Sequence, residues 1–246
     1  MSVSYKIAAY LEEAGDDVDA CLSTLGKVGI GTIILRNLYG GNICDTASDD
    51  TLKNIKKRTN NLNIYAVSCK YNPKSDLVKY FNISEFFGSS HIIIDCDDKD
   101  FLLSNIDKIS ELSYDYNKGV LIETKSFLST FDLIGITRDH KKINILYDPV
   151  QIILNRRVDH FEKYWVLLKS RISAVDVRDC KIGRGFLPIG LGDVAVGKLL
   201  KDCDKDKLLI MEPNLGRRFR DLKSRSETFL LSYDNLISII HGELPN

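Results

Sequence analysis

The chain contains eight short apolar runs, each followed by a longer polar or amphipathic segment. Each run is nearly continuous in apolar residues, which is typical of parallel strands buried on both faces. A parallel pair also needs a long crossover between its strands, usually a helix, and the intervening segments are long enough for one. We predict strands over Tyr5–Tyr10, Gly31–Arg36, Ile64–Cys69, His91–Cys96, Gly119–Thr124, Ile143–Asp148, Ile172–Arg178 and Leu208–Glu212.

The segments between these runs carry helix signals. Asp16 or Asp17 can cap a helix that begins at Val18, and Ser48 can cap the next one. Apolar residues recur at three-to-four spacing over Phe101–Leu112, which indicates an amphipathic helix. We predict helices over Val18–Leu25, Ser48–Asn60, Ser75–Phe81, Phe101–Leu112, His160–Ser170, Asp193–Leu200 and Ser226–Ile240.

Eight strand–helix units in 246 residues indicate an α/β fold, the (β/α)8 or TIM barrel. We expect residues 1–246 to form a single barrel domain, because barrels of this kind use this length for one domain. An open, doubly wound sheet is the alternative. That fold usually carries a glycine-rich turn after its first strand, and Leu11–Gly15 is no such turn.

Composition and charge narrow the functional classes. Lysine plus arginine and aspartate plus glutamate both number 34, so the formal net charge is zero, which argues against a nucleic-acid or anionic-membrane partner. No apolar stretch approaches the roughly 20 residues of a membrane span, and Met1–Tyr10 resembles no secretory signal. The six cysteines include no C-x-x-C pair, so we expect free thiols in a reducing cytoplasm. The oligomeric state stays open, and a homo-oligomer is possible.

Carboxylates stand at the ends of four successive predicted strands. They are Glu123, Asp148, Asp176 (followed by Asp179) and Glu212. In a barrel, catalytic groups stand at the carboxyl ends of the strands, so these side chains should share one rim. Like charges that close repel one another, and a divalent cation is the usual remedy.

Five segments carry a resemblance to a known superfamily, in this order: Leu121–Glu123, Leu146–Pro149, Val175–Asp179, Pro188–Val194 and Ile210–Pro213. Over roughly residues 119–215 the chain resembles the xylose-isomerase-like TIM-barrel superfamily, which contains sugar-phosphate isomerases, epimerases and endonuclease IV enzymes. The Pro-x-Gly-x-Gly-Asp segment at Pro188–Asp193 is the most specific of these motifs.

The resemblance implies a metal-assisted isomerase or epimerase of a small sugar or sugar-phosphate-like compound. In that branch, Glu123, Asp148, Asp176 and Glu212 would hold a divalent metal, and Glu123 and Glu212 would also act as acid and base. The strand-seven ligand is normally histidine, and here it is Asp176. An all-oxygen shell suits Mn²⁺ or Mg²⁺ better than Zn²⁺.

Basic residues near the same rim are candidates for substrate binding. They are Lys70, Arg178, Arg184, Arg217 and Arg218, the last three in loops where barrels often bind phosphate.

Two other functions stay open. One is an endonuclease IV-like phosphodiesterase, although none of the four histidines lies at a predicted rim position. The other is a non-catalytic sugar-binding barrel that has lost the strand-seven histidine.

Overall fold

The computed structural model describes residues 5–39, 41–156, 161–213 and 224–243. Eight parallel strands form a closed barrel, in which the first strand pairs with both the second and the last. The predicted barrel is therefore confirmed, and every strand lies within two residues of its predicted bounds. The barrel strands are β1 (Lys6–Tyr10), β2 (Thr32–Leu35), β5 (Asn63–Tyr71), β6 (His91–Cys96), β7 (Gly119–Glu123), β8 (Ile143–Tyr147), β9 (Ile172–Val177) and β12 (Leu208–Met211).

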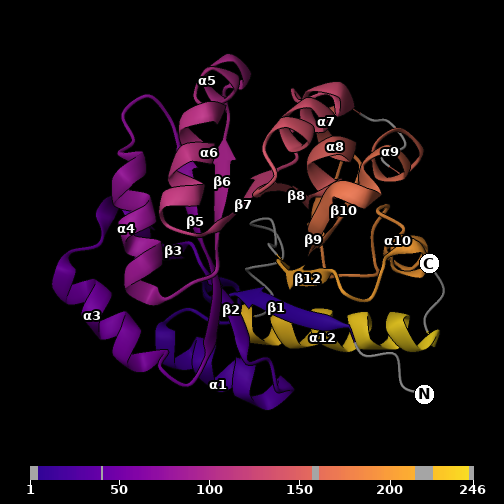
Figure 1. Cartoon of the computed structure of the whole chain (residues 1–246). Coiled ribbons are helices and arrows are strands. Elements are labelled where there is room, and N and C mark those ends of the chain that lie inside the picture. Colours follow the sequence, from indigo (N-terminus) through magenta and orange to yellow (C-terminus); the bar gives the residue numbers. More distant parts are fainter. Residues whose placement is uncertain (1–4, 40, 157–160, 214–223, 244–246) are drawn as a thin grey trace.

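Helices surround the strands, and the long helix α12 lies beside α1 (Figure 1). None of the described helices is both long and apolar enough to cross a membrane. The α-helices are α1 (Val18–Val28), α2 (Ile43–Thr46), α3 (Asp49–Arg58), α4 (Leu77–Phe87), α5 (Lys99–Ser104), α6 (Ile106–Asp115), α7 (Thr130–Asp139), α8 (Pro149–Arg156), α9 (Val166–Leu168), α10 (Val196–Asp202) and α12 (Arg225–His241). Short turns of 3-10 or π helix occur at η1 (Leu11–Glu13), η2 (Phe161–Trp165) and η3 (Lys169–Arg171).

Several helices differ from their predicted form. The predicted helix over Phe101–Leu112 is divided into α5 and α6 at Asn105, whose side chain donates to the Phe101 carbonyl at 2.8 Å. The segment predicted over His160–Ser170 is broken into η2, α9 and η3. Sequence analysis missed α7 and α8, although Ser129 and Asp132 form a capping box at the start of α7.

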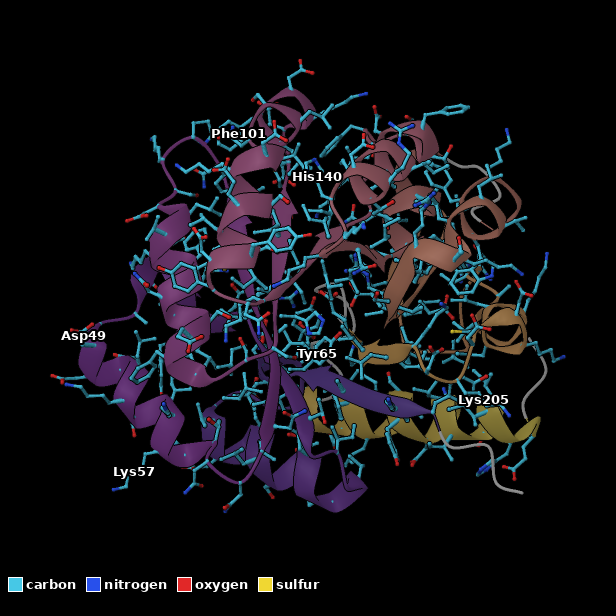
Figure 2. All side chains as sticks on the ribbon, in the orientation of Figure 1. Asp49, Lys57, Tyr65, Phe101, His140 and Lys205 are labelled. Carbon is cyan, nitrogen blue, oxygen red and sulfur yellow. The ribbon has the colours of Figure 1, made fainter. Side chains whose placement is uncertain are left out.

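Side chains inside the barrel form an apolar layer. Because side chains alternate along a strand, every second residue points inward. The inward residues are Ala8, Tyr10, Ile34, Ala66, Ile93, Leu121, Leu146, Ala174, Leu208 and Ile210. The residues between them pack outward beneath the helices, whose exposed faces carry charges such as Asp49 and Lys57 of α3 (Figure 2). In several strands the next inward residue, two positions toward the carboxyl end, is polar. A polar layer therefore lies next to the apolar one, at the carboxyl ends of the strands.

Two small β-hairpins lie at the carboxyl ends of the barrel strands. The first pairs β3 (Asn37–Leu38) with β4 (Gly41–Asn42), and the second pairs β10 (Asp179–Lys181) with β11 (Gly185–Leu187). All six cysteines are buried and free, as expected.

Asp179 organises the loop that follows the second hairpin. Its buried carboxylate accepts hydrogen bonds from the backbone N–H groups of Cys180, Gly190, Gly192 and Val194, at 2.8 to 3.2 Å. A Cβ atom at Gly192 would clash with that carboxylate. The Pro188–Asp193 motif is thus a loop wrapped around one aspartate.

We predict that Asp179→Ala lowers the free energy of unfolding by about 3 kcal/mol, because it leaves several buried N–H groups without an acceptor. Urea denaturation measures the loss. Asp206→Ala, at an exposed position, is the control and should change stability by no more than about 0.5 kcal/mol. Equal stability of the two variants would contradict this role for Asp179.

Candidate active site

The four predicted carboxylates all lie in the polar layer. Glu123 ends β7, Asp148 follows β8, Asp176 lies in β9 and Glu212 follows β12. Ligand oxygens of Glu123, Asp148 and Asp176 lie within 4.8 Å of one another, a group of described residues that does not include Glu212. Asp148 and Asp176 are fully buried, and Glu123 is buried with 9% of its surface exposed.

Arg178 lies between two of these carboxylates. Its Nε donates to Asp148 Oδ1 at 3.1 Å, and its Nη2 donates to Asp148 Oδ2. Its Nη1 lies 3.3 Å from Glu212 Oε1. The guanidinium also packs on the ring of Phe186 in β11, 5.2 Å from the ring centroid, so the hairpin covers it. The predicted substrate-binding residue Arg178 is therefore committed to ion pairs within the protein.

Arg36, at the end of β2, forms a second centre of positive charge. Its guanidinium contacts Glu12 at 2.7 Å, Glu13 at 3.2 Å and Glu212 at 2.7 Å. It also stacks on the ring of Tyr10, 3.9 Å from the ring centroid. Sequence analysis missed Glu12 as a site residue. The alternation of inward residues Ala8 and Tyr10 along β1 would have indicated it.

Lys125 provides the third cation, and sequence analysis missed it as well. Its Nζ lies 3.0 Å from Glu123 Oε1 and 2.7 Å from Asp95 Oδ1. Lys70 extends this network, with its Nζ 2.5 Å from Asp97 Oδ2 and 3.8 Å from Asp95 Oδ2. Because Lys125 stands two residues after Glu123, it continues the inward face beyond the end of β7.

The carboxylates titrate differently because their partners differ. Burial raises the pKa of Glu123 to about 7, even though Lys125 opposes the shift. Burial would also raise the pKa of Glu212, but Arg178 and Arg36 outweigh it and hold that pKa below its usual value. Asp176 has its pKa raised well above the usual range, first by burial and then by the charge of Glu212. Neither Asp176 oxygen has a hydrogen-bond partner within the described ranges.

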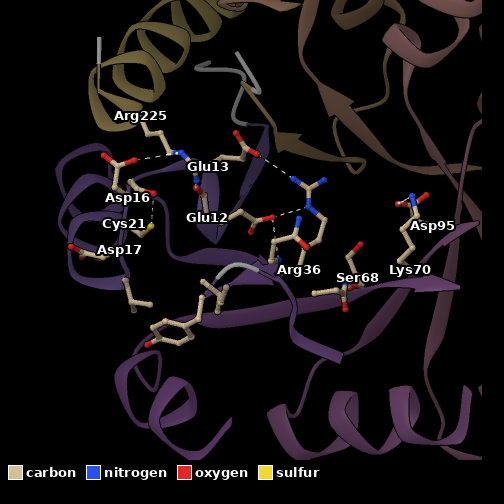
Figure 3. Close-up of a pocket in the computed structure, with 16 residues that line it drawn as sticks. Glu12, Glu13, Asp16, Asp17, Cys21, Arg36, Ser68, Lys70, Asp95 and Arg225 are labelled. Carbon is tan, nitrogen blue, oxygen red and sulfur yellow. Dashed lines mark hydrogen bonds and ion pairs between the residues drawn. The ribbon is translucent and has the colours of Figure 1, made fainter. Parts of the chain in front are cut away.

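A pocket of about 590 Å³ opens beside this layer (Figure 3). Arg36 points toward Glu12 on one side, and Lys70 lies beside Asp95 on the other (Figure 3). The pocket borders the carboxylates because its wall residues Arg36 and Asp95 contact Glu212 and Lys125, respectively. Its polar wall includes Glu12, Arg36, Asn42, Ser68, Lys70 and Asp95.

The remaining predicted residues are dispersed. Lys70 lines the pocket. Arg184 is exposed at the turn between β10 and β11 and is not among the residues that line the pocket. Arg217 and Arg218 lie outside the described residues.

The histidines in the described part of the chain lie away from the carboxylates. His91 begins β6 at the opposite end of the barrel, where its ring stacks on Tyr65 at 4.4 Å between centroids. His140 follows α7, and His241 ends α12.

Solved structures share this architecture. No protein-family model and no curated protein matches the sequence. A xylose isomerase domain protein from Planctomyces limnophilus is similar over 98% of both chains, with a TM-score of 0.71 and 12% identity. The chain has the xylose isomerase-like barrel fold.

Two further structures show how widely this architecture is shared. A Thermus thermophilus protein soaked with zinc chloride matches with a TM-score of 0.61 at 12% identity, over 96% of this chain and 98% of that one. A tryptophan synthase alpha subunit from Pyrococcus furiosus matches with a TM-score of 0.61 at 11% identity, over 96% of this chain and 100% of that one. At such identities the likeness concerns the fold alone.

The xylose isomerase-like resemblance implies a divalent metal, and the residues present do not fit the predicted four-carboxylate shell. Asp148 Oδ1 accepts hydrogen bonds from Val150 N at 2.9 Å, Gln151 N at 3.3 Å and Arg178 Nε. It thereby caps α8 at its first turn. Its other oxygen is bonded to Arg178. Asp148 is therefore fully engaged without an ion.

We predict that Glu123→Gln becomes more stable relative to the native protein as the pH rises. A carboxyl with a raised folded pKa binds its proton more tightly when folded, so the fold loses stability between about pH 4.5 and 7. Glutamine does not titrate. The free energy of unfolding of the variant, taken relative to that of the native protein, should therefore rise by about 2 kcal/mol from pH 5 to pH 8.

Urea denaturation at both pH values measures this shift. Glu111→Gln, on an exposed face of α6, is the matched control and should show no such dependence. A parallel pH dependence for both variants would contradict the raised pKa of Glu123.

Proposed function

We propose that this protein is an enzyme that isomerises a small polyhydroxylated carbonyl compound, a sugar or a sugar-phosphate-like molecule. The observation that carries the proposal is the Glu123 carboxyl, with a pKa of about 7, beside the Lys125 ammonium at 3.0 Å. A general base works best when its pKa is near the working pH. A neighbouring cation can stabilise negative charge that develops on the substrate.

The chemistry follows from these two groups. The Glu123 carboxylate takes the proton from the carbon next to the carbonyl, and the electron pair of the broken C–H bond forms a C=C bond. The carbonyl oxygen becomes an enediolate oxygen, whose negative charge Lys125 faces. Glu123 then returns the proton to the neighbouring carbon, while a proton moves between the two oxygens. The product is the isomeric ketose or aldose.

The contrast between the two glutamates favours isomerisation over epimerisation. Epimerisation needs a second group to deliver a proton to the opposite face of the carbon. Arg36 and Arg178 hold the pKa of Glu212 low, which keeps this group ionised and a poor proton donor. Asp176 is too buried to reach a substrate. Of these three carboxyls only Glu123 combines a pKa near neutrality with some exposure, and a single base that moves one proton between adjacent carbons matches them.

The adjacent pocket supports a polar substrate. Asn42, Ser68 and Lys70 line it together with Asp95 and Arg36. Such a mixture of donors and acceptors suits a molecule with several hydroxyl groups, since each hydroxyl both donates and accepts. We propose that the substrate lies in this pocket with its carbonyl end toward Lys125.

We predict that Glu123→Gln lowers kcat by about 10²–10⁴-fold with little change in KM, because an amide cannot accept the carbon-bound proton. The assay incubates a panel of aldoses, ketoses and their phosphates in deuterated water, and nuclear magnetic resonance detects deuterium entering the carbon next to the carbonyl. Glu111→Gln is the control. Loss of no more than about twofold in the Glu123 variant would remove it from the base role.

The same panel separates the alternatives. Absence of deuterium exchange with every sugar, together with cleavage of DNA at abasic sites, would favour an endonuclease IV-like activity. Binding of a sugar without exchange would favour a non-catalytic barrel.

We predict that Lys70→Ala raises KM about tenfold, because the side chain lines the pocket and one charge-assisted hydrogen bond is worth about that factor. Arg184→Ala should leave KM unchanged, because Arg184 is exposed and not among the pocket residues. Steady-state kinetics on the active sugar measures both. The reverse ranking would assign substrate binding to the β10–β11 turn.

A further inference from the structure

We propose that Arg178, with Arg36 and Lys125, occupies the place of a divalent metal ion in the carboxylate layer, so that the native protein excludes such an ion. Distance alone would allow one, since ligand oxygens of Glu123, Asp148 and Asp176 lie within 4.8 Å of one another. The charges around these oxygens argue the opposite.

Each ionised carboxylate of the layer already faces a protein cation. Asp148 is paired with Arg178 through both oxygens. Glu212 Oε1 lies 2.7 Å from Arg36 Nη1 and 3.3 Å from Arg178 Nη1. An ion that took Asp148 or Glu212 as a ligand would compete with a guanidinium, which stays protonated at every pH the protein meets.

The Arg178 side chain has no other position to which a bound ion could displace it. The residue is 4% exposed, with Phe186 of the hairpin packed on its guanidinium. If an ion took over Asp148, the guanidinium would remain buried without its main partner, next to a second positive charge. A buried charge without a partner is strongly unfavourable. Arg178 therefore excludes the ion in two ways: its positive charge repels the ion, and its side chain cannot move elsewhere to make room.

Glu123 and Asp176 cannot replace these ligands. Lys125 Nζ lies 3.0 Å from Glu123 Oε1, and Lys125 itself is held by Asp95 at 2.7 Å. Asp176 is the one carboxyl of the layer without a partner in the described ranges. Asp176 is a single buried ligand, and Arg178 follows it two residues later on the same strand end. One carboxyl beside a fixed cation is a poor site for a divalent ion.

The test measures metal binding directly, so its outcome does not depend on which substrate the proposed isomerase uses. Chelator-treated native protein is titrated calorimetrically with Mn²⁺, Mg²⁺ and Zn²⁺, and its melting temperature is recorded with each ion. We expect no stoichiometric binding and no ion-dependent rise in melting temperature. Stoichiometric binding of any of the three ions by the native protein, accompanied by such a rise, would overturn the proposal.

Variants identify the excluding group. Arg178→Met removes the charge at similar length, and it should bind Mn²⁺ about tenfold or more tightly than the native protein. Arg178→Lys keeps a cation and should stay free of metal. Arg184→Met, at an exposed arginine, is the matched control. If Arg178→Met does not fold, Lys125→Met, which frees Glu123, serves in its place. A folded variant that lacks the cation and gains no affinity would contradict exclusion by these side chains.

Discussion

Compensation of buried negative charge by protein cations is the constraint on which the upper half of the barrel depends. Below the polar layer the interior is apolar, and the carboxylates of the layer are themselves buried. Carboxylates held between these regions need partners, because an uncompensated buried charge costs about 3–5 kcal/mol. Arg36, Arg178 and Lys125 provide them.

These cations also connect the ends of the strands. Arg178 joins the ends of β8, β9 and β12 through Asp148 and Glu212. Arg36 joins the end of β2 to η1 and to the end of β12, and Lys125 joins β7 to β6 through Asp95. The rim is thus held by ion pairs that cross between strands, in addition to the backbone ladder below. The same contacts set the proton affinities of the site, since Glu123 has one lysine where Glu212 has two arginines.

The sequence was sufficient for the barrel and for the position of the carboxylates. Strands buried on both faces are continuous apolar runs, and a residue at the end of such a run has only one rim to occupy. The sequence was not sufficient for the partners. Nothing local in the chain relates Arg178 to Asp148, thirty positions earlier, or Arg36 to Glu212. Lys125 could have been found, because the inward alternation through Leu121 and Glu123 leads to it. Helix α7 was missed although its capping box, Ser129 with Asp132, is a local signal.

The polar layer is also where a xylose isomerase-like barrel is free to differ from others of its architecture. The fold recurs at 11–12% identity, so what it requires of a sequence is little more than apolar strands and strand–helix order. Those features fix the lower layer, whose only requirement is volume and hydrophobicity. The layer above has no such requirement. It must only be neutral enough to stay buried, and a metal ion or a set of arginines and lysines can meet that condition equally well. The chemistry of the site then follows from the choice of cation. A metal would hold substrate oxygens directly, whereas Arg36, Arg178 and Lys125 set the proton affinities of the carboxyls beside them, which is the basis on which we propose Glu123 as the base.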